Sequence, residues 1–277
     1  NTNWDINNIG NYSFACGLNT KASGNFSHAE GNNTTASGSY SHAEGDNTKA
    51  NGNCSHAEGN KTTANVPYSH AEGYHTTASG SGSHAEGYYT TANGNYSHAE
   101  GGYTTTNGNY SHAEGNYTTA SGVGSHAEGV RSMAYLYAQH ASASGCFSWS
   151  GDAQYSRLVV YASTSDATPK TLRLGDSYYV TIPQNTSWGF TAYVVARSST
   201  GSSAYWELKG LIKRGTGSPS IVGTVSKTKI AGDSDTSSWD VDVQADTTNN
   251  SLNIVATGVS GVSIHWVATI NLTEVGY

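Results

Sequence analysis

The five-residue motif Ser27-His28-Ala29-Glu30-Gly31 decides the fold, because it returns along the chain at a constant interval. Further copies begin at Ser41, Ser55, Ser69, Ser83, Ser97, Ser111 and Ser125, each fourteen residues after the one before. A strict period indicates that every repeat is one structural unit stacked on its neighbours. Degenerate copies at Ser13-Phe14-Ala15-Cys16-Gly17 and Gln139-His140-Ala141 extend the region, as terminal units of a stack commonly do. We therefore predict a repeat domain over residues 1–145 and a second domain over residues 146–277.

Each repeat reads as two short strands separated by glycine turns. After the motif come two variable residues and a second small-residue segment, which is Thr34-Thr35-Ala36-Ser37-Gly38 in the first copy. Since strand side chains alternate between faces, Ser27 and Ala29 should point into a narrow coil while His28 and Glu30 point outward. An interior of Ser, Ala, Thr and Gly buries too little apolar area to offset the conformational entropy of folding. We therefore expect oligomerisation, with the His and Glu side chains of each chain packed against those of its neighbours.

The segments Tyr40–Gly45 and Thr34–Gly38 resemble the fourteen-residue head repeats of trimeric autotransporter adhesins. The resemblance covers residues 11–145 and implies a left-handed parallel β-roll that assembles as a homotrimer. It departs from the family at His28 and Glu30, where those repeats usually carry aliphatic residues. If the register of the family holds, the residues in these two slots line the trimer interface. We name them the His/Glu face, which comprises His28, Glu30, His42, Glu44, His56, Glu58, His70, Glu72, His84, Glu86, His98, Glu100, His112, Glu114, His126 and Glu128.

After Gly145 the pattern changes to longer alternating strands separated by Gly, Ser, Asp and Asn turns. The predicted strands are Leu158–Tyr161, Tyr178–Ile182, Phe190–Arg197, Tyr205–Lys213, Ile221–Ile230, Val241–Ala245, Leu252–Thr257 and Ile264–Leu272. Strands at this spacing predict an all-β domain of the antiparallel β-sandwich or jelly-roll type. The segments Thr181–Trp188, Val222–Val225 and Trp266–Gly276 look like the C-terminal domain of many bacteriophage tail and tail-fibre proteins. This resemblance disfavours an autotransporter, which would continue into a coiled-coil stalk.

The adjacent Ser and His of each motif do not form a nucleophile and its base. Neighbours on a strand point to opposite faces, so Ser27 cannot transfer its proton to His28. His28 and Glu30 share a face, and imidazole and carboxylate groups are competent metal ligands. Between a metal or anion site along the trimer axis and a structural His–Glu network we favour the network, because buried charges need partners. The sequence therefore predicts no catalytic residue, no metal site, no cofactor and no enzymatic activity.

Aromatic residues are the candidates for glycan contact, because their faces can stack on sugars. Tyrosines recur in the two slots after the motif and form a predicted aromatic column, and a second column occupies the slot before it: Tyr40, Tyr68, Tyr96 and Tyr110. Tryptophans gather in the second half, where each serves either as core or as ligand platform. The predicted glycan-contacting residues are Tyr74, Tyr88, Tyr89, Tyr103, Tyr117, Trp188, Trp206 and Trp239.

One group of aspartates raises the question of calcium, and its members lie around Trp239: Asp233, Asp235, Asp240 and Asp242. The spacing lacks the glycine and the terminal glutamate of an EF-hand loop. A solvated acidic loop is therefore the favoured interpretation.

Composition argues against several classes of protein. The chain has a formal net charge of −7 and no basic cluster of the kind that binds nucleic acid. It has no apolar run long enough to insert into a membrane. The three cysteines cannot form a complete disulfide framework and are predicted to be free thiols. Since the chain opens at Asn1 without Met, with Trp4, Ile6 and Ile9 as apolar anchors, we expect its start to cap the stack or to continue an upstream tail or fibre segment.

Together these features predict a homotrimeric, receptor-binding fragment of a bacteriophage tail fibre, located in the virion and acting at the bacterial cell surface. The repeat domain would provide a rigid shaft, and the second domain would recognise a bacterial surface glycan or close the trimer. Two alternatives remain open, a bacterial trimeric surface adhesin and a fibre-borne polysaccharide depolymerase. The depolymerase needs two carboxylates about 5–9 Å apart in a groove, and no such pair stands out in the sequence.

Overall fold

The computed structural model describes residues 9–277, which divide into two compact units. The first, here called the repeat unit, ends at Tyr135, and the second, the C-terminal unit, comprises Leu136–Tyr277. The sequence-based domain boundary at residue 145 falls within the C-terminal unit. Of the predicted N-terminal cap, Trp4 and Ile6 lie outside the described residues, whereas Ile9 is partly buried and forms a parallel bridge with Ala22. Within residues 9–277, no helix has the length and apolar character needed to cross a membrane.

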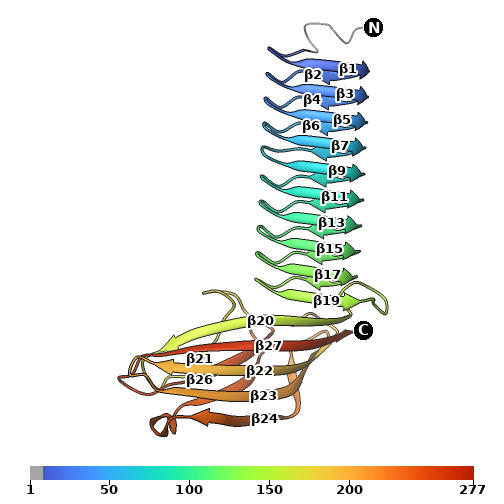
Figure 1. Ribbon diagram of the computed structural model, residues 1–277. Helices are drawn as coiled ribbons and strands as arrows, with labels where there is room; N and C mark the ends of the chain where they lie inside the picture. Colours follow the sequence, from blue (N-terminus) through green and yellow to red (C-terminus); the bar gives the residue numbers. More distant parts are fainter. Residues whose placement is uncertain (1–8) are drawn as a thin grey trace. The chain divides into compact units, whose positions relative to one another are not determined.

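Every coil of the repeat unit contributes one five-residue strand and one two-residue strand (Figure 1). The five-residue strands are β1 (Phe14–Leu18), β3 (His28–Asn32), β5 (His42–Asp46), β7 (His56–Asn60), β9 (His70–Tyr74), β11 (His84–Tyr88), β13 (His98–Gly102), β15 (His112–Asn116) and β17 (His126–Val130). The two-residue strands are β2 (Lys21–Ala22), β4 (Thr35–Ala36), β6 (Lys49–Ala50), β8 (Thr63–Ala64), β10 (Thr77–Ala78), β12 (Thr91–Ala92), β14 (Thr105–Thr106), β16 (Thr119–Ala120) and β18 (Met133–Ala134).

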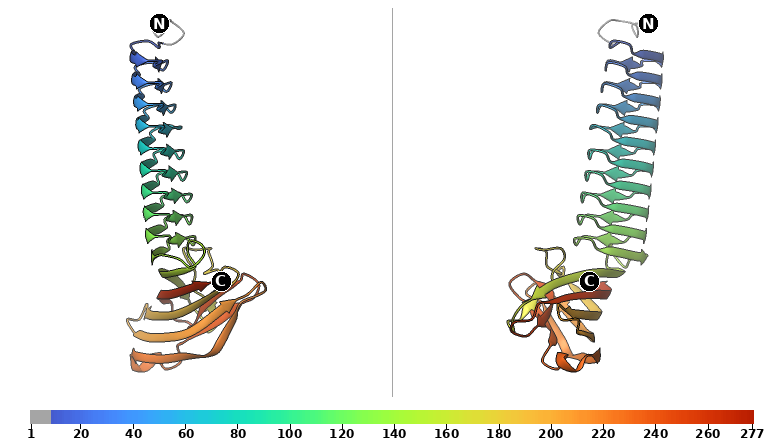
Figure 2. Two further views of the ribbon diagram at one scale, coloured as in Figure 1. Left: turned by 90° about the vertical axis from the view of Figure 1, so that its right-hand side faces the viewer. Right: turned by 60° about the vertical axis from the view of Figure 1, so that its left-hand side comes forward.

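Figure 2 shows the strands of successive coils stacked on one another, and they pair in parallel. Their register places the same motif position along one column. Between β9 and β11, for example, His70 lies opposite His84 and Glu72 lies opposite Glu86. The two-residue strands form a second parallel sheet in the same way. The prediction of an all-β stack of fourteen-residue coils is confirmed.

The interior of the coil is built from small side chains. Ala71, Ala78, Ala85 and their equivalents in other coils are fully buried, as the alternation of the motif predicts. The motif serine is buried too, and its hydroxyl donates to a backbone carbonyl three residues earlier, as Ser55 Oγ does to Gly52 O at 2.6 Å. The threonine column behaves differently, because its buried hydroxyls have no hydrogen-bond partner: Thr20, Thr34, Thr48, Thr62, Thr76, Thr90, Thr104 and Thr118. An unpaired buried hydroxyl is destabilising, so this interior provides little stability for a single chain.

The C-terminal unit consists of a large and a small antiparallel sheet. The large sheet follows the order β19 (His140–Ser144), β20 (Ala153–Thr164), β27 (Ile264–Gly276), β22 (Thr186–Ser198), β23 (Ser203–Arg214) and β24 (Ser220–Gly232). The small sheet follows the order β21 (Lys170–Thr171), β26 (Ser251–Thr257) and β25 (Asp240–Asp246), and a 3-10 turn, η1 (Ser234–Thr236), precedes β25. The core holds Trp206, Trp239 and Trp266, with the ring centres of Trp206 and Trp266 5.6 Å apart.

Seven of the eight strands predicted for this half lie within observed strands, and the antiparallel all-β prediction is confirmed. The exception is Tyr178–Ile182, which makes only isolated bridges, from Tyr178 to Leu174 and from Thr181 to Ser251. The alternation of apolar and polar residues in this segment arises from burial alone, because Val180 and Ile182 pack into the core although the segment joins no sheet. The short strand β21 was not predicted.

The three cysteines are free, as predicted. Cys16 is exposed on β1 and lies opposite Glu30 of β3, the residue whose slot it occupies in its own coil. Cys54 is also exposed, and Cys146 is partly buried in the C-terminal unit.

Candidate functional site

The His/Glu face forms two continuous columns on the outside of the coil. Each five-residue strand presents its first and third residues outward, while the motif serine and alanine point into the coil. Both outward side chains are only partly exposed, with values of 33% for His84 and 32% for Glu86. Because the strands are in register, one column contains imidazoles and the other contains carboxylates.

The imidazoles stack on one another along the column. Ring centres of successive histidines lie 4.6 Å apart at His70–His84 and 5.0 Å apart at His98–His112, with interplanar angles of 11° and 1°. A ring nitrogen binds a metal in the plane of its ring, so parallel rings direct their nitrogens side by side. Although His70, Glu72 and His84 offer ligand atoms within 4.8 Å of one another, the two imidazoles do not converge on one point as a tetrahedral zinc site requires. The arrangement suits a stacked column better than a metal centre.

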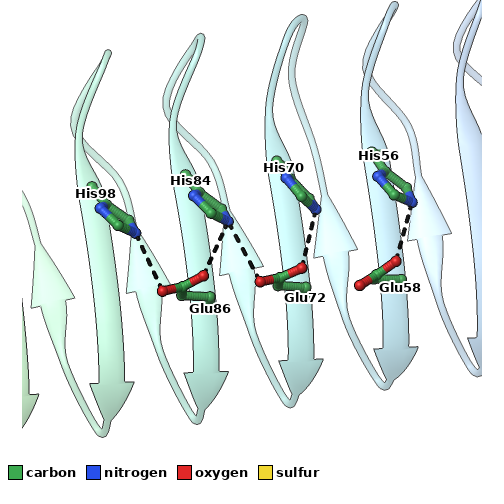
Figure 3. A network of polar contacts seen from close by, with 7 residues as sticks. All are labelled: His56, Glu58, His70, Glu72, His84, Glu86 and His98. Carbon is green, nitrogen blue, oxygen red and sulfur yellow. Dashed lines mark ion pairs between the residues drawn. The ribbon is translucent and has the colours of Figure 1, made fainter.

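Histidines and glutamates form ion-pair contacts whose partners change along the column (Figure 3). His56 Nε2 lies 3.6 Å from the Glu58 carboxylate of its own strand. His84 lies between two carboxylates, 3.7 Å from Glu86 and 4.0 Å from Glu72. These separations exceed a good hydrogen bond, and the Nε2 atoms of His56 and His84 are buried without a hydrogen-bond partner. Within one chain the pairs therefore contribute little to stability.

The face also carries less charge than its composition suggests. Burial lowers the pKa of His42, His56, His84 and His98, which favours neutral imidazoles. The hydrogen bond shared with Glu100, followed by that with Glu72, raises the pKa of Glu86 to about 7. The same hydrogen bonds from Glu86 lower the pKa of Glu72 and Glu100, which act as ionised acceptors. Carboxylates stacked in register thus share protons instead of all remaining ionised.

An open groove of about 540 Å³ runs beside the carboxylate column. Five glutamates line it, together with the glycines that follow several of them: Glu58, Glu72, Glu86, Glu100 and Glu114. Glycine leaves backbone accessible at this surface, so a second chain can approach closely.

We expect replacement of Glu86 by glutamine to raise stability at pH 8 and to leave it nearly unchanged at pH 4.5. A carboxyl whose folded-state pKa is raised contributes stability that is complete below pH 4.5 and is lost as the pH rises through about 7. Glutamine keeps the donor and cannot ionise. Thermal unfolding of wild type and Glu86→Gln at both pH values measures the difference in stability between the two proteins. The opposing contributions of the histidines are the same in both proteins and therefore cancel in this difference.

Glu207→Gln is the control for this prediction, because Glu207 pairs with Lys209 at 3.0 Å in the C-terminal unit and should show no gain at pH 8. If Glu86→Gln differed from wild type in stability by the same amount at pH 8 and at pH 4.5, the proposed sharing of protons between the glutamates would be contradicted.

The tyrosines after the motif form two adjacent columns, where the sequence analysis expected one. Tyr74 stacks on Tyr88 at 5.2 Å, and in the next slot Tyr89, Tyr103 and Tyr117 stack on one another. The columns meet edge to face at Tyr88 and Tyr89, whose ring centres are 4.7 Å apart. All five rings remain exposed, from 38% for Tyr74 to 47% for Tyr88. They therefore form a continuous, accessible aromatic surface.

The predicted tryptophan contacts require correction. Trp188, Trp206 and Trp239 are 0%, 2% and 4% exposed, so they belong to the core and not to a glycan-binding surface. Trp206 and Trp239 both pack against Trp266, with ring centres 5.6 and 5.9 Å from it, and their large apolar area is buried. In this half the exposed tryptophan is Trp149, at 51%.

Three of the four aspartates near Trp239 accept hydrogen bonds from other groups of the chain. Asp233 accepts from Ser203 N at 2.8 Å, Asp235 accepts from the Ser202 hydroxyl at 2.5 Å, and Asp240 accepts from Lys227 Nζ at 2.8 Å. The contact between Asp240 of β25 and Lys227 of β24 ties the small sheet to the large one.

A pocket in the C-terminal unit is lined by Tyr161, Arg173 and His265, none of which is among the site residues predicted from the sequence. The alternation of β20, in which Tyr155, Arg157, Val159 and Tyr161 are exposed, was the available signal. No local sequence pattern indicates that Arg173 lines the pocket, because its position there results from an isolated backbone bridge to Tyr161.

Comparison with known proteins identifies the repeats. Residues 29–53, 71–97 and 113–135 match the family model of the YadA head domain repeat, which agrees with the resemblance to autotransporter adhesin heads. No curated protein matches the sequence significantly. The repeats of this chain are thus similar to those of the YadA head domain, and they stack as a parallel β-solenoid.

Two solved structures are weakly similar. One is the tailspike protein gp49 from Acinetobacter baumannii bacteriophage Fri1, a capsular polysaccharide depolymerase, with a TM-score of 0.27 and 10% identity over 90% of this chain and 40% of that one. The other is the tailspike protein of Acinetobacter phage vB_ApiP_P1, with a TM-score of 0.24 and 10% identity over 96% of this chain and 56% of that one. The chain thus spans about half the length of these tailspikes.

The prediction that the protein is not an enzyme is corrected by this comparison, because the Fri1 tailspike is a depolymerase and hence an enzyme. A likeness of this extent assigns no catalytic residue to the present chain. The absence of enzymatic activity is accordingly no part of the function proposed below.

Proposed function

We propose that this chain is the fibre segment of a bacteriophage attachment protein, which assembles as a homotrimer through the His/Glu face and binds a bacterial surface glycan. The feature that carries the proposal is the unbroken His/Glu face itself. A repeated, half-buried polar column with reduced charge is costly for a single chain, and it is suited to burial against identical columns.

Three further properties of the repeat unit support self-association. The coil interior contains only small side chains and a column of unpaired threonine hydroxyls, so it needs stabilisation from outside. The groove beside the glutamates offers a concave surface for another chain. In addition, the His Nε2 atoms that have no hydrogen bond within one chain can gain hydrogen-bond partners when the His/Glu faces of several chains pack together.

The aromatic columns support contact with a glycan. Tyr74, Tyr88, Tyr89, Tyr103 and Tyr117 are exposed in adjacent rows, and extended aromatic surfaces bind sugar rings by stacking. Because neighbouring rings repeat along the column, several sugar units can bind at once, and such multivalent binding raises the overall affinity.

A bacterial trimeric surface adhesin is the second candidate, and the match to the YadA head domain repeat favours it. Both candidates attach to a surface through a trimeric fibre. They differ in whether the fibre belongs to a virion or to a cell.

Binding of the full chain to a panel of bacterial cells tests the attachment role. We expect binding to some strains, its loss after periodate oxidation of surface glycans, and a reduction of about tenfold or more in Tyr74→Ala/Tyr88→Ala/Tyr103→Ala, since stacking on each ring contributes roughly 1 kcal/mol. Binding that survives periodate treatment would contradict a glycan receptor. Release of reducing ends from the cells, measured in the same samples, detects depolymerisation.

A further inference from the structure

The C-terminal unit contains an open pocket of about 460 Å³ at one end of its large sheet. The pocket involves β20 and β27, which lie side by side in Figure 1, together with β21 and the segment that follows it. Six of its lining residues carry the inference: Tyr161, Lys170, Arg173, Asp176, His265 and Val267.

Backbone pairing places an aromatic ring between a cation and an apolar side chain. Tyr161 N donates to Arg173 O at 3.0 Å, and Arg173 N donates to Tyr161 O at 3.1 Å. On its other side, Tyr161 lies opposite Val267 of β27. Residues directly opposite in antiparallel strands project from the same face, so the three side chains form one row. The next row brings His265 opposite Ser163.

The Tyr161 ring is a fixed and accessible platform. It is 43% exposed, and its hydroxyl donates to Asp176 Oδ1 at 3.0 Å. This hydrogen bond raises the pKa of the Tyr161 phenol, which keeps the group neutral. A ring held in this way can stack on a sugar ring without losing rotational freedom on binding.

The cations of the pocket are held in place without a direct ion pair to a carboxylate. The Arg173 guanidinium lies 3.8 Å over the Tyr179 ring, and Lys170 Nζ donates to Ser163 O at 2.9 Å. Among residues 9–277, Arg173, Lys170 and His265 have no carboxylate within 4.0 Å. A positioned guanidinium fork matches the geometry of a carboxylate.

The surrounding sheet face has the same sign of charge. Exposed basic residues from three strands point to the side of Tyr161: Arg157, Arg197, Lys209 and Lys213. Glu207 is the acidic residue on these strands that shares their face, and it is paired with Lys209. The chain as a whole has a formal net charge of −7, so this face differs in sign from the rest of the protein. Local positive potential attracts anionic ligands and favours their binding.

We propose that this pocket binds a carboxylate-bearing sugar residue, such as a uronic acid, of an acidic polysaccharide. Tyr161 stacks on the sugar ring, Arg173 pairs with the carboxylate, and Lys170 and His265 add positive charge at the rim. The basic sheet face accommodates neighbouring units of the polymer. The inference rests on the proposed attachment to a glycan, and it adds the chemical class of that glycan and a site that binds it.

The test measures binding of the full chain to polygalacturonate and to the same polymer after carboxyl reduction, which removes the charge and keeps the sugar. We expect binding to polygalacturonate to be at least about tenfold tighter, because a charge-assisted hydrogen bond contributes roughly 1.5–3 kcal/mol. Arg173→Gln and Tyr161→Ala should each weaken it by about tenfold or more, whereas Tyr161→Phe, which keeps the ring, should remain within about threefold. Lys49→Gln removes one charge from exposed β6 of the repeat unit and should have no effect.

Equal binding of both polymers would overturn the inference, and so would unchanged binding by Arg173→Gln with a native circular dichroism spectrum. Equally tight binding of polyglutamate would overturn it too, because it would indicate a site for carboxylates without a sugar. Absence of binding to either polymer would also refute it. If the chain nevertheless binds bacterial cells through periodate-sensitive glycans, the attachment role survives and only the acidic-sugar site fails. If it binds no glycan on cells, the proposed function itself fails.

Discussion

Replacing Gly101 by alanine is expected to destabilise the repeat unit by about 3 kcal/mol or more, one of the largest effects of any single methyl group in this protein. Gly101 has φ +101°, a backbone conformation that L-residues with a Cβ rarely adopt. An added Cβ would lie 2.2 Å from the carbonyl oxygen of Gly115 in the next coil. Since that neighbour is backbone, relief requires the coils to separate and lose ladder hydrogen bonds. Thermal unfolding followed by circular dichroism measures the loss.

The adjacent glycine is a matched control for this prediction. Gly102 occupies a slot that holds Tyr88 in the previous coil and Asn116 in the next, so side chains fit there. An added Cβ at Gly102 would meet only the Asn116 Nδ2 atom, at the end of a side chain that can rotate away. Gly102→Ala should therefore change stability by less than about 0.5 kcal/mol. Equal stabilities of Gly101→Ala and Gly102→Ala would contradict the close packing of coils.

The triple change His70→Ala, His84→Ala and His98→Ala is expected to dissociate the trimer at concentrations where the wild type remains assembled. Each substitution removes a ring from the centre of the His/Glu face and leaves neighbouring carboxylates such as Glu72 and Glu86 without an imidazole. At an interface, a centrally placed ring contributes on the order of 1 kcal/mol or more, and the loss recurs in all three chains. Analytical ultracentrifugation over a micromolar concentration series measures the effect.

A second triple variant controls for the number of rings removed. Tyr74→Ala, Tyr88→Ala and Tyr103→Ala deletes the same number of exposed rings from the aromatic columns instead of from the His/Glu face. It should remain trimeric, while its binding to bacterial cells falls by about tenfold or more. Dissociation of both variants to the same extent would show that the assembly does not depend on the histidines.

The repeat unit could be predicted closely because its information is local and periodic. The fourteen-residue interval, the small residues in alternating slots and the outward His and Glu all follow from the motif at Ser27. The division of the tyrosines into two columns did not, because it depends on which side of the corner each slot faces. Tyr88 belongs to strand β11, whereas Tyr89 has φ 55° and already begins the turn.

The C-terminal unit was less predictable, because its site depends on contacts between distant segments. Strand positions follow from alternation, but Tyr178–Ile182 shows that alternation also arises from burial without pairing. That a residue is a tryptophan does not tell whether it lies in the core or on the surface, and Trp188, Trp206 and Trp239 lie in the core. The pocket at Tyr161 needed the bridge to Arg173 and the register with β27, neither of which has a signature in the sequence.

The mass of the intact chain in solution tests the central claim most directly, because the account assigns the His/Glu face to contact between identical chains. Multi-angle light scattering at micromolar concentration and neutral pH should give three times the chain mass of 28.9 kDa. A stable, folded monomer of 28.9 kDa under these conditions would contradict the account.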